Sequence, residues 1–182
     1  MTRILFHRNT PWQSAIRCST NIFAKLFIDN GHSAAYMQGV VHAGHILAKR
    51  GRWESWAAGP RHEHGAFVFT PLSVIPYSQQ RPFDRVWAAH ASYRSCIPSI
   101  RNRLQRGGFG IPEVIWTANP GSSMLKQIFP ESRLIFQVVD YYPAFSGNSI
   151  REIERIDYEA ADHLFVIGHM LKNYIVNEHG ID

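Results

Sequence analysis

The chain has 182 residues, of which 45% are hydrophobic and 18% are charged, with a formal net charge of +5 and a pI near 9.5. This length and apolar content predict one domain with a sizeable core and exclude intrinsic disorder. No apolar run approaches the roughly 20 residues of a membrane span. The positive charge favours an anionic partner, and nucleic acid, a phosphorylated substrate and an acidic membrane surface all meet that condition.

Apolar runs predict six strands, which cover residues 4–6, 32–37, 65–70, 113–117, 134–139 and 164–167. Helical patterns lie between most of them. The first predicted helix carries Ile22, Phe23, Leu26 and Phe27 on one face and ends at Asn30-Gly31. A long one over 83–106 is kinked by Pro98, and others run to 129, over 150–161 and after 168. Residues 39–64 show no clear pattern.

This alternation is typical of a parallel sheet with helices on both faces. We therefore expect a Rossmann-like, three-layer α/β/α domain with a mostly parallel sheet of about six strands. Since the chain contains no repeat, linker or low-complexity tract, residues 1–182 are expected to form a single domain.

The most informative stretch is 133–168, in which a buried strand stops at Asp140. Ligands of open α/β sheets bind at the carboxyl ends of strands, so Asp140, Tyr141, Tyr142 and Phe145 are candidate site residues. A carboxylate at the end of a buried strand is expected to hold its proton tightly and to act as a general base. A turn or helix cap is the structural alternative for Asp140. Ser149 and Glu152 fit a capping box for the following helix.

Two further loops follow predicted strands. The loop after the first strand supplies His7, Arg8, Asn9 and Thr10, and the fourth strand is followed by Asn119. The first loop has no glycine, which argues against a nicotinamide or flavin site, and the chain contains no phosphate-binding loop motif. We therefore expect no such cofactor. Ligand binding and a purely structural role remain open for residues 7–10.

Three other groups of residues have a plain explanation and a functional one. His42-x-x-His45 and His62-Glu63-His64 lack further ligands at a recognisable spacing, which favours surface histidines over a metal site. The arginines at 94, 101, 103 and 106 favour a solvated helix face, since no nucleic-acid-binding signature accompanies them. Trp53 and Trp56 lie among Lys49, Arg50, Arg52 and Arg61, a mixture that suits a bilayer surface, although burial in the core is favoured.

Taken together, these segments resemble the N-terminal domain of GT-B-fold glycosyltransferases, in particular the large bacterial group described as family 1 or family 4. The resemblance covers nearly the whole chain. Its matching segments are Asn30-Gly31-His32, 116–120, VVDYYPAF at 138–145, Glu154 on the next helix, ADHLFV at 161–166 and GHML at 168–171. The chain departs from the family in its first loop, where 12–15 (WQSA) replaces the usual paired glycines.

The resemblance implies a sugar transfer from a nucleotide diphosphate donor to an acceptor hydroxyl, in bacterial polysaccharide or glycolipid synthesis, without a metal. The chain stops about where the family's linker begins, so we expect it to be an acceptor-binding half whose C-terminal, nucleotide-sugar domain is absent. A natural half that pairs with a separate chain is the alternative. The isolated domain is then expected to be inactive. Asp140 would be the base of an inverting enzyme, and would only position the acceptor in a retaining one.

The expected partners are a sugar or lipid-linked acceptor and, in one version, an anionic membrane surface, but not nucleic acid. The two distant cysteines, Cys18 and Cys96, and the absence of a signal-peptide pattern favour a cytoplasmic location, with peripheral attachment to the inner face of the membrane as a variant. A non-catalytic binding or assembly domain of Rossmann-like fold is the competing hypothesis. A downstream second Rossmann-like domain with paired glutamates would favour the enzyme.

Overall fold

The central sheet of the computed structural model has seven strands among the described residues, which are all but 16–17, 46–49, 79–80, 148 and 182. In spatial order they are β4 (Arg61–Glu63), β5 (Ala66–Phe69), β2 (Ser33–Gln38), β1 (Arg3–Arg8), β7 (Val114–Thr117), β8 (Arg133–Val138) and β9 (His163–Val166). All neighbouring strands run parallel except β4, which is antiparallel to β5. A separate parallel pair joins β3 (Val41–His42) to β6 (Leu72–Ser73).

The six strands expected from the sequence are all present, and they occupy the doubly wound order in which the third, second, first, fourth, fifth and sixth follow one another across the sheet. The extra strand, β4, lies in the stretch that showed no pattern. Its sequence, Arg-His-Glu, has no apolar residue, so periodicity could not predict it. Pairing with β5 alone places it at the edge of the sheet.

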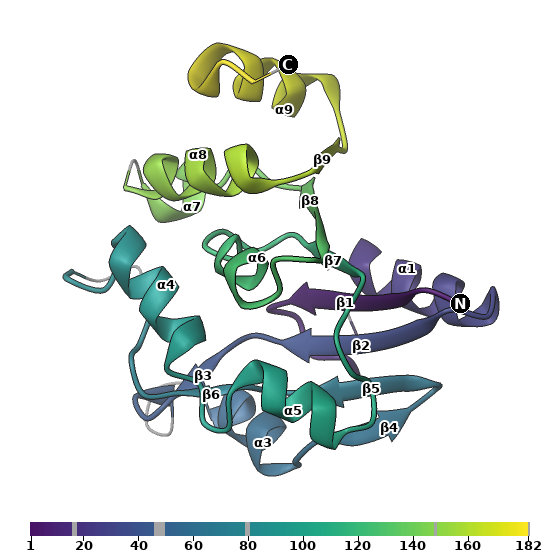
Figure 1. Cartoon of the computed structure of the whole chain (residues 1–182). Helices are drawn as coiled ribbons and strands as arrows, with labels where there is room; N and C mark the ends of the chain where they lie inside the picture. The colour runs from purple at the N-terminus through teal and green to yellow at the C-terminus, as the bar shows by residue number, and fades with distance from the viewer. Residues whose placement is uncertain (16–17, 46–49, 79–80, 148, 182) are drawn as a thin grey trace.

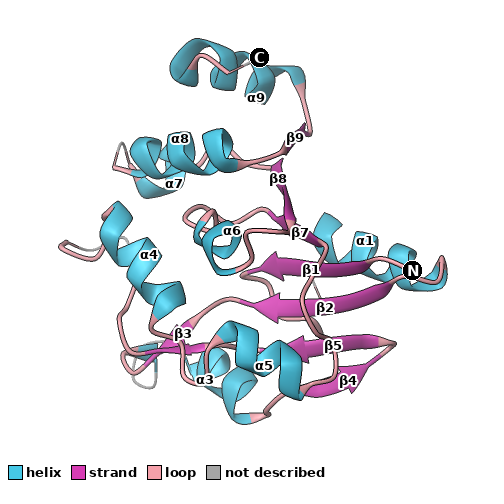
Figure 2. Ribbon diagram, viewed as in Figure 1, coloured by secondary structure: helices cyan, strands magenta, loops and turns pink. Residues whose placement is uncertain are grey.

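Helices pack on both faces of the sheet (Figures 1 and 2). They are α1 (Ser19–Asp29), α3 (Arg50–Ala57), α4 (Val86–Arg94), α5 (Ile100–Arg106), α6 (Met124–Ile128), α7 (Pro143–Ser146), α8 (Ile150–Ala160), α9 (His169–Tyr174) and the π-helical turn η1 (Ile175–His179). Alternate residues of each strand serve the two faces. Phe6 and Tyr36 join a core with α1, whereas Leu5 and Met37 join one with α4, α5 and α6. The Rossmann-like α/β expectation is confirmed.

Three local predictions were wrong. In α1, Phe23 and Phe27 face the sheet, but Ile22 and Leu26 are each 53% exposed. Because residues of a helix are about 100° apart, the turn positions that place Phe23 and Phe27 inward direct those two side chains outward. Two polar residues of the first turn, Thr20 and Asn21, are buried instead.

The long helix expected over 83–106 is two helices, α4 and α5, separated at 95–99. Pro98 has no N–H to continue a helix, and Ser99 starts the next one, where its Oγ accepts a hydrogen bond from the Asn102 N–H at 3.3 Å. The capping box expected at the start of α8 is also absent. Ser149 has helical backbone angles and its side chain makes no capping hydrogen bond, because α7 ends only at Ser146 and Gly147 turns the chain.

The indoles of Trp53 and Trp56 are half-buried on α3 and stack on each other with ring centroids 4.6 Å apart. They are thus neither core residues nor fully exposed. Lys49 of the same basic group lies outside the described residues. No helix in the described part of the chain has the length and apolar character needed to cross a membrane.

Candidate functional site

A cavity of about 470 Å³ opens at the carboxyl edge of the sheet. Its wall comes from the loops that follow β1, β7 and β8, from residues after β2, and from α3 and α4. The arrowheads of β1 and β2 in Figures 1 and 2 point toward this side of the molecule, where α4 and β3 lie. From β1 the sheet is extended by β2 on one side and by β7 on the other, so the strand order reverses its direction at β1. The cavity therefore lies at the switch point where doubly wound sheets bind ligands.

Seven of the nine site residues expected from the sequence line this cavity, and they are Arg8, Asn9, Thr10, Asn119, Asp140, Tyr142 and Phe145. Tyr141 does not line it, because the ring packs edge-on against Tyr174 with centroids 4.8 Å apart. His7 does not line it either. In β1, successive side chains point to opposite faces of the sheet, so that His7 and Arg8 point in different directions.

His7 is fully buried beneath the cavity. Its Nδ1 lies 3.0 Å from the Met37 carbonyl oxygen, which only accepts hydrogen bonds, so Nδ1 carries the proton. Nε2 is then the acceptor for the Tyr93 hydroxyl at 2.9 Å and the Asn119 amide at 3.1 Å. Burial lowers the pKa of His7 to about 4. His7 therefore does not face the cavity, as the sequence had suggested, but is a neutral imidazole that forms hydrogen bonds with two residues of the cavity wall.

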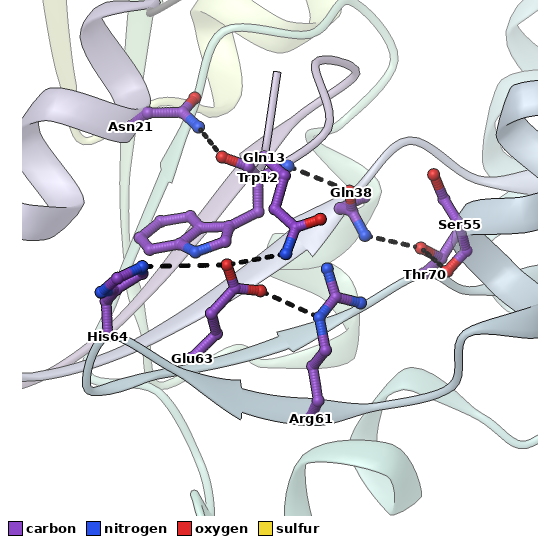
Figure 3. Close-up of polar contacts among 9 residues, drawn as sticks. All are labelled: Trp12, Gln13, Asn21, Gln38, Ser55, Arg61, Glu63, His64 and Thr70. Carbon is purple, nitrogen blue, oxygen red and sulfur yellow. Dashed lines mark hydrogen bonds and ion pairs between the residues drawn. The ribbon is translucent and has the colours of Figure 1, made fainter. Parts of the chain in front are cut away.

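The loop after β1 is fixed by side chains rather than by glycines (Figure 3). Trp12 is buried. Its backbone N–H donates to Gln38 Oε1 at 3.0 Å, and its backbone carbonyl accepts from Asn21 Nδ2 at 3.2 Å. Gln38 in turn donates to Thr70 Oγ1 at 2.9 Å, which links the ends of β2 and β5. The Tyr36 hydroxyl donates to the Thr10 carbonyl at 3.0 Å. The loop that follows β1 is thus anchored by a buried indole and side-chain hydrogen bonds instead of a glycine-rich turn.

The loop after β7 forms hydrogen bonds with a carboxylate on α8. Asp157 is fully buried and accepts hydrogen bonds from the Gly121 and Ser123 N–H groups at 2.5 and 2.8 Å. The Asn119 side-chain oxygen accepts from the Asn9 N–H at 3.2 Å, which ties this loop to the one after β1. Burial raises the pKa of Asp157 to about 7, although the two backbone donors oppose that shift. These hydrogen bonds join the loops after β1 and β7, which form part of the cavity wall, to each other and to α8.

Asp140 lies at the mouth of the cavity beside Arg8. Its carboxylate is 47% exposed, and Oδ2 is 3.8 Å from Arg8 Nη2. The strand β8 ends at Val138, two residues before Asp140, so the carboxylate does not share the burial of that strand. Arg8 also donates from Nη1 to the Ala118 carbonyl at 2.9 Å. The guanidinium thus lies within ion-pair distance of a carboxylate that stays half exposed at the cavity.

Tyr142 completes this side of the wall. Its hydroxyl donates to the Ala118 carbonyl at 2.5 Å, and burial raises its pKa to about 12, so it stays a neutral phenol. Phe145 is 69% exposed at the rim. An aromatic rim next to a carboxylate and an amide suits a ligand that has both apolar faces and hydroxyl groups, such as a sugar ring.

Other wall residues were not expected from the sequence, and they include His42, His45, Arg52, Tyr77 and Tyr93. The position of residues 40–45 immediately after β2 was a usable signal for the two histidines. Arg52 gave no such signal, since α3 approaches the cavity only in three dimensions. The His42 and His45 rings lie 3.8 Å apart, with His45 buried. Within the described residues, no group of three or more His, Cys, Asp or Glu side chains is arranged to hold a metal ion.

A comparison with protein-family models and a search of curated proteins both find no match to this chain.

Proposed function

We propose that this chain is the acceptor-binding domain of a GT-B-type glycosyltransferase, which moves a sugar from a nucleotide diphosphate donor to an acceptor hydroxyl in bacterial polysaccharide or glycolipid synthesis. A second domain would bind most of the donor. The observation that carries the proposal is the position of Asp140, a half-exposed carboxylate held by Arg8 at a cavity on the switch point of the sheet.

In this proposal the acceptor binds across the cavity with one hydroxyl against Asp140. The free carboxylate oxygen takes the hydroxyl proton while the acceptor oxygen forms its bond to the anomeric carbon and the nucleotide diphosphate leaves. Asn9, whose backbone N–H donates to the Asn119 side chain, lines the cavity and offers its own amide to other hydroxyls. Phe145 and Tyr142 provide the aromatic surface that a sugar ring or lipid stem packs on.

The test is Asp140→Asn in the enzyme that joins this domain to its donor-binding domain. Asparagine keeps the shape of the side chain but does not accept a proton in this way, and a general base contributes ~10²–10⁴-fold in rate. We expect kcat to fall at least ~100-fold in an inverting enzyme, with the melting temperature nearly unchanged. As a control, Glu159→Gln changes an exposed carboxylate on α8 and should leave kcat unaltered.

Two results would count against this role of Asp140. A loss of only a few-fold in kcat would show that the carboxylate positions the acceptor without taking its proton, as in a retaining enzyme. A large fall in melting temperature would show that Asp140 is a structural partner of Arg8.

A further inference from the structure

The cavity wall contains two arginines that differ in their partners. Arg8 is engaged by Asp140 and by the Ala118 carbonyl. Arg52, which projects from α3, makes no hydrogen bond or ion pair with any described residue and is half-buried. Burial lowers the pKa of its guanidinium. The guanidinium is partly removed from water and lines the cavity without an acidic partner among the described residues, so it is available to an anion that enters the cavity.

The charged residues among the described residues that line the cavity also favour an anionic ligand. Asp140 is the one acidic residue among the described residues that line the cavity, and Arg8 balances it. Among the described residues that line the cavity, Arg52 is therefore an arginine without a carboxylate of its own. Tyr77 lines the same cavity, and burial raises its pKa, so its hydroxyl remains a neutral hydrogen-bond donor.

We propose that the ligand of this cavity carries a phosphate group, which Arg52 binds. The inference rests on the proposed function, because it specifies the class of acceptor. The planar fork of a guanidinium matches two phosphate oxygens at once. Phosphate has a third oxygen, which a hydroxyl donor such as Tyr77 can bind while the guanidinium binds the other two, and it carries more negative charge than a carboxylate. A sugar phosphate and the phosphate headgroup of a lipid share this chemistry.

The experiment measures binding by calorimetry, with glucose 6-phosphate, glucose and glucuronate as phosphorylated, neutral and carboxylate probes. The proteins are the wild type, Arg52→Gln and the matched control Arg106→Gln, which removes an exposed arginine at the end of α5 outside the cavity wall. Since a charge-assisted hydrogen bond is lost, Arg52→Gln should weaken glucose 6-phosphate binding by roughly 10- to 100-fold. Arg106→Gln should bind like the wild type, and glucose and glucuronate should bind more weakly.

A vesicle arm separates the two sources of phosphate. Sedimentation with phosphatidylcholine vesicles, with and without phosphatidic acid, shows whether a lipid headgroup fills the site. Capture by phosphatidic acid that depends on Arg52 and not on Arg106 indicates a lipid, and glucose 6-phosphate binding without capture indicates a soluble acceptor. Arg52→Lys keeps the charge without the fork and should bind with intermediate affinity, which covers the case that Arg52→Gln does not fold.

Three outcomes would overturn the inference: no phosphate probe binds the wild type in either arm, the Arg52 and Arg106 variants lose affinity equally, or glucuronate binds as tightly as glucose 6-phosphate. None of these readouts uses transfer activity. Failure here with a large Asp140→Asn effect on kcat would reject only the acceptor class. Arg52-dependent phosphate binding without an Asp140 effect would reject the proposed reaction and keep the site.

Discussion

His7 shows how one buried side chain organises a site that it does not enter. It contacts the end of β2, α4 and the loop after β7 through Met37, Tyr93 and Asn119, and it does so as a neutral ring. Protonation would place a second donor at Nε2 opposite the Asn119 amide and would bury a charge. The wall of the cavity thus depends on the charge state of a residue outside it.

This dependence predicts a pH effect on stability. The pKa of His7 is lowered to about 4, so the unfolded chain takes up its proton near the ordinary imidazole range, while the folded protein does not. Stability from His7 is therefore present above about pH 6.5 and is lost as pH falls toward 4, by about 3 kcal/mol. His7→Gln, which keeps a donor and an acceptor, should be less stable than the wild type at pH 7.5 and should close that gap by about 2–3 kcal/mol at pH 4.5.

Urea denaturation of both proteins at the two pH values measures this gap. The comparison with His7→Gln is needed because Asp157 makes stability depend on pH in the opposite direction. The pKa of Asp157 is raised to about 7, so its contribution to stability is present at low pH and is lost as pH rises through 7. That contribution is common to both proteins and cancels. A gap that stays constant with pH would show that His7 is not the neutral, buried ring described above.

At the scale of elements, α8 packs beside β8 and also supports the loop after β7 and contacts α9. It projects Asp157 under the loop after β7, so that a helix on one side of the sheet sets the geometry of a loop at its carboxyl edge. Glu154, one turn earlier and also buried, accepts from the Tyr158 and Tyr174 hydroxyls and joins α8 to α9. The two inward carboxylates connect the cavity to the last helix of the chain.

Removing Asp157 should therefore be costly. Asp157→Ala leaves the Gly121 and Ser123 N–H groups buried without an acceptor, and each such group costs about 1–3 kcal/mol. We expect a fall of at least about 2 kcal/mol in the free energy of unfolding. The control on the same helix is Glu159→Ala, which removes an exposed pair with Arg155 and should cost less than about 0.5 kcal/mol. Equal losses in both variants, measured by urea denaturation, would contradict the proposed role.

For the whole molecule, the doubly wound sheet and the site at its switch point leave open which ligand occupies it. A nucleotide site of this fold needs a backbone turn close to the diphosphate, whereas this chain places the anchored Trp12 loop after β1. The positive charge at the cavity comes from Arg52 on α3 instead. The fold is Rossmann-like, but its first loop lacks the glycines with which such folds bind a diphosphate.

This arrangement predicts that a nucleoside adds nothing to binding. Uridine diphosphate glucose should bind the chain no more than about tenfold more tightly than glucose 6-phosphate, a difference below about 1.4 kcal/mol. Competition calorimetry with the two ligands checks it, and uridine serves as the control for contacts made by the nucleoside alone. Much tighter, stoichiometric binding of the nucleotide sugar would reject the division of labour between two domains.

The sequence by itself determined the six parallel strands, the alternation with helices and most of the cavity residues that follow β1, β7 and β8. The reason is local: apolar runs fix strands, and the carboxyl ends of parallel strands meet at one edge of a sheet. It failed where side-chain direction or partner choice was decisive. The local sequence pattern did not indicate that the His7 side chain is buried and does not line the cavity, nor that the Asp140 carboxylate is half exposed.

Only the tertiary structure decided three things: the edge strand β4, the position of Arg52 at the cavity, and the support of the loop after β7 by Asp157. The last two join residues that are distant along the chain, since Asp157 is 36 positions from Gly121, whereas β4 is a short polar strand that pairs with its neighbour β5. Such contacts arise from the way layers pack over a sheet, and neither helical nor strand periodicity records which distant residue will meet which. The sequence thus specified the elements and one edge of the sheet, and packing specified the chemistry of the cavity.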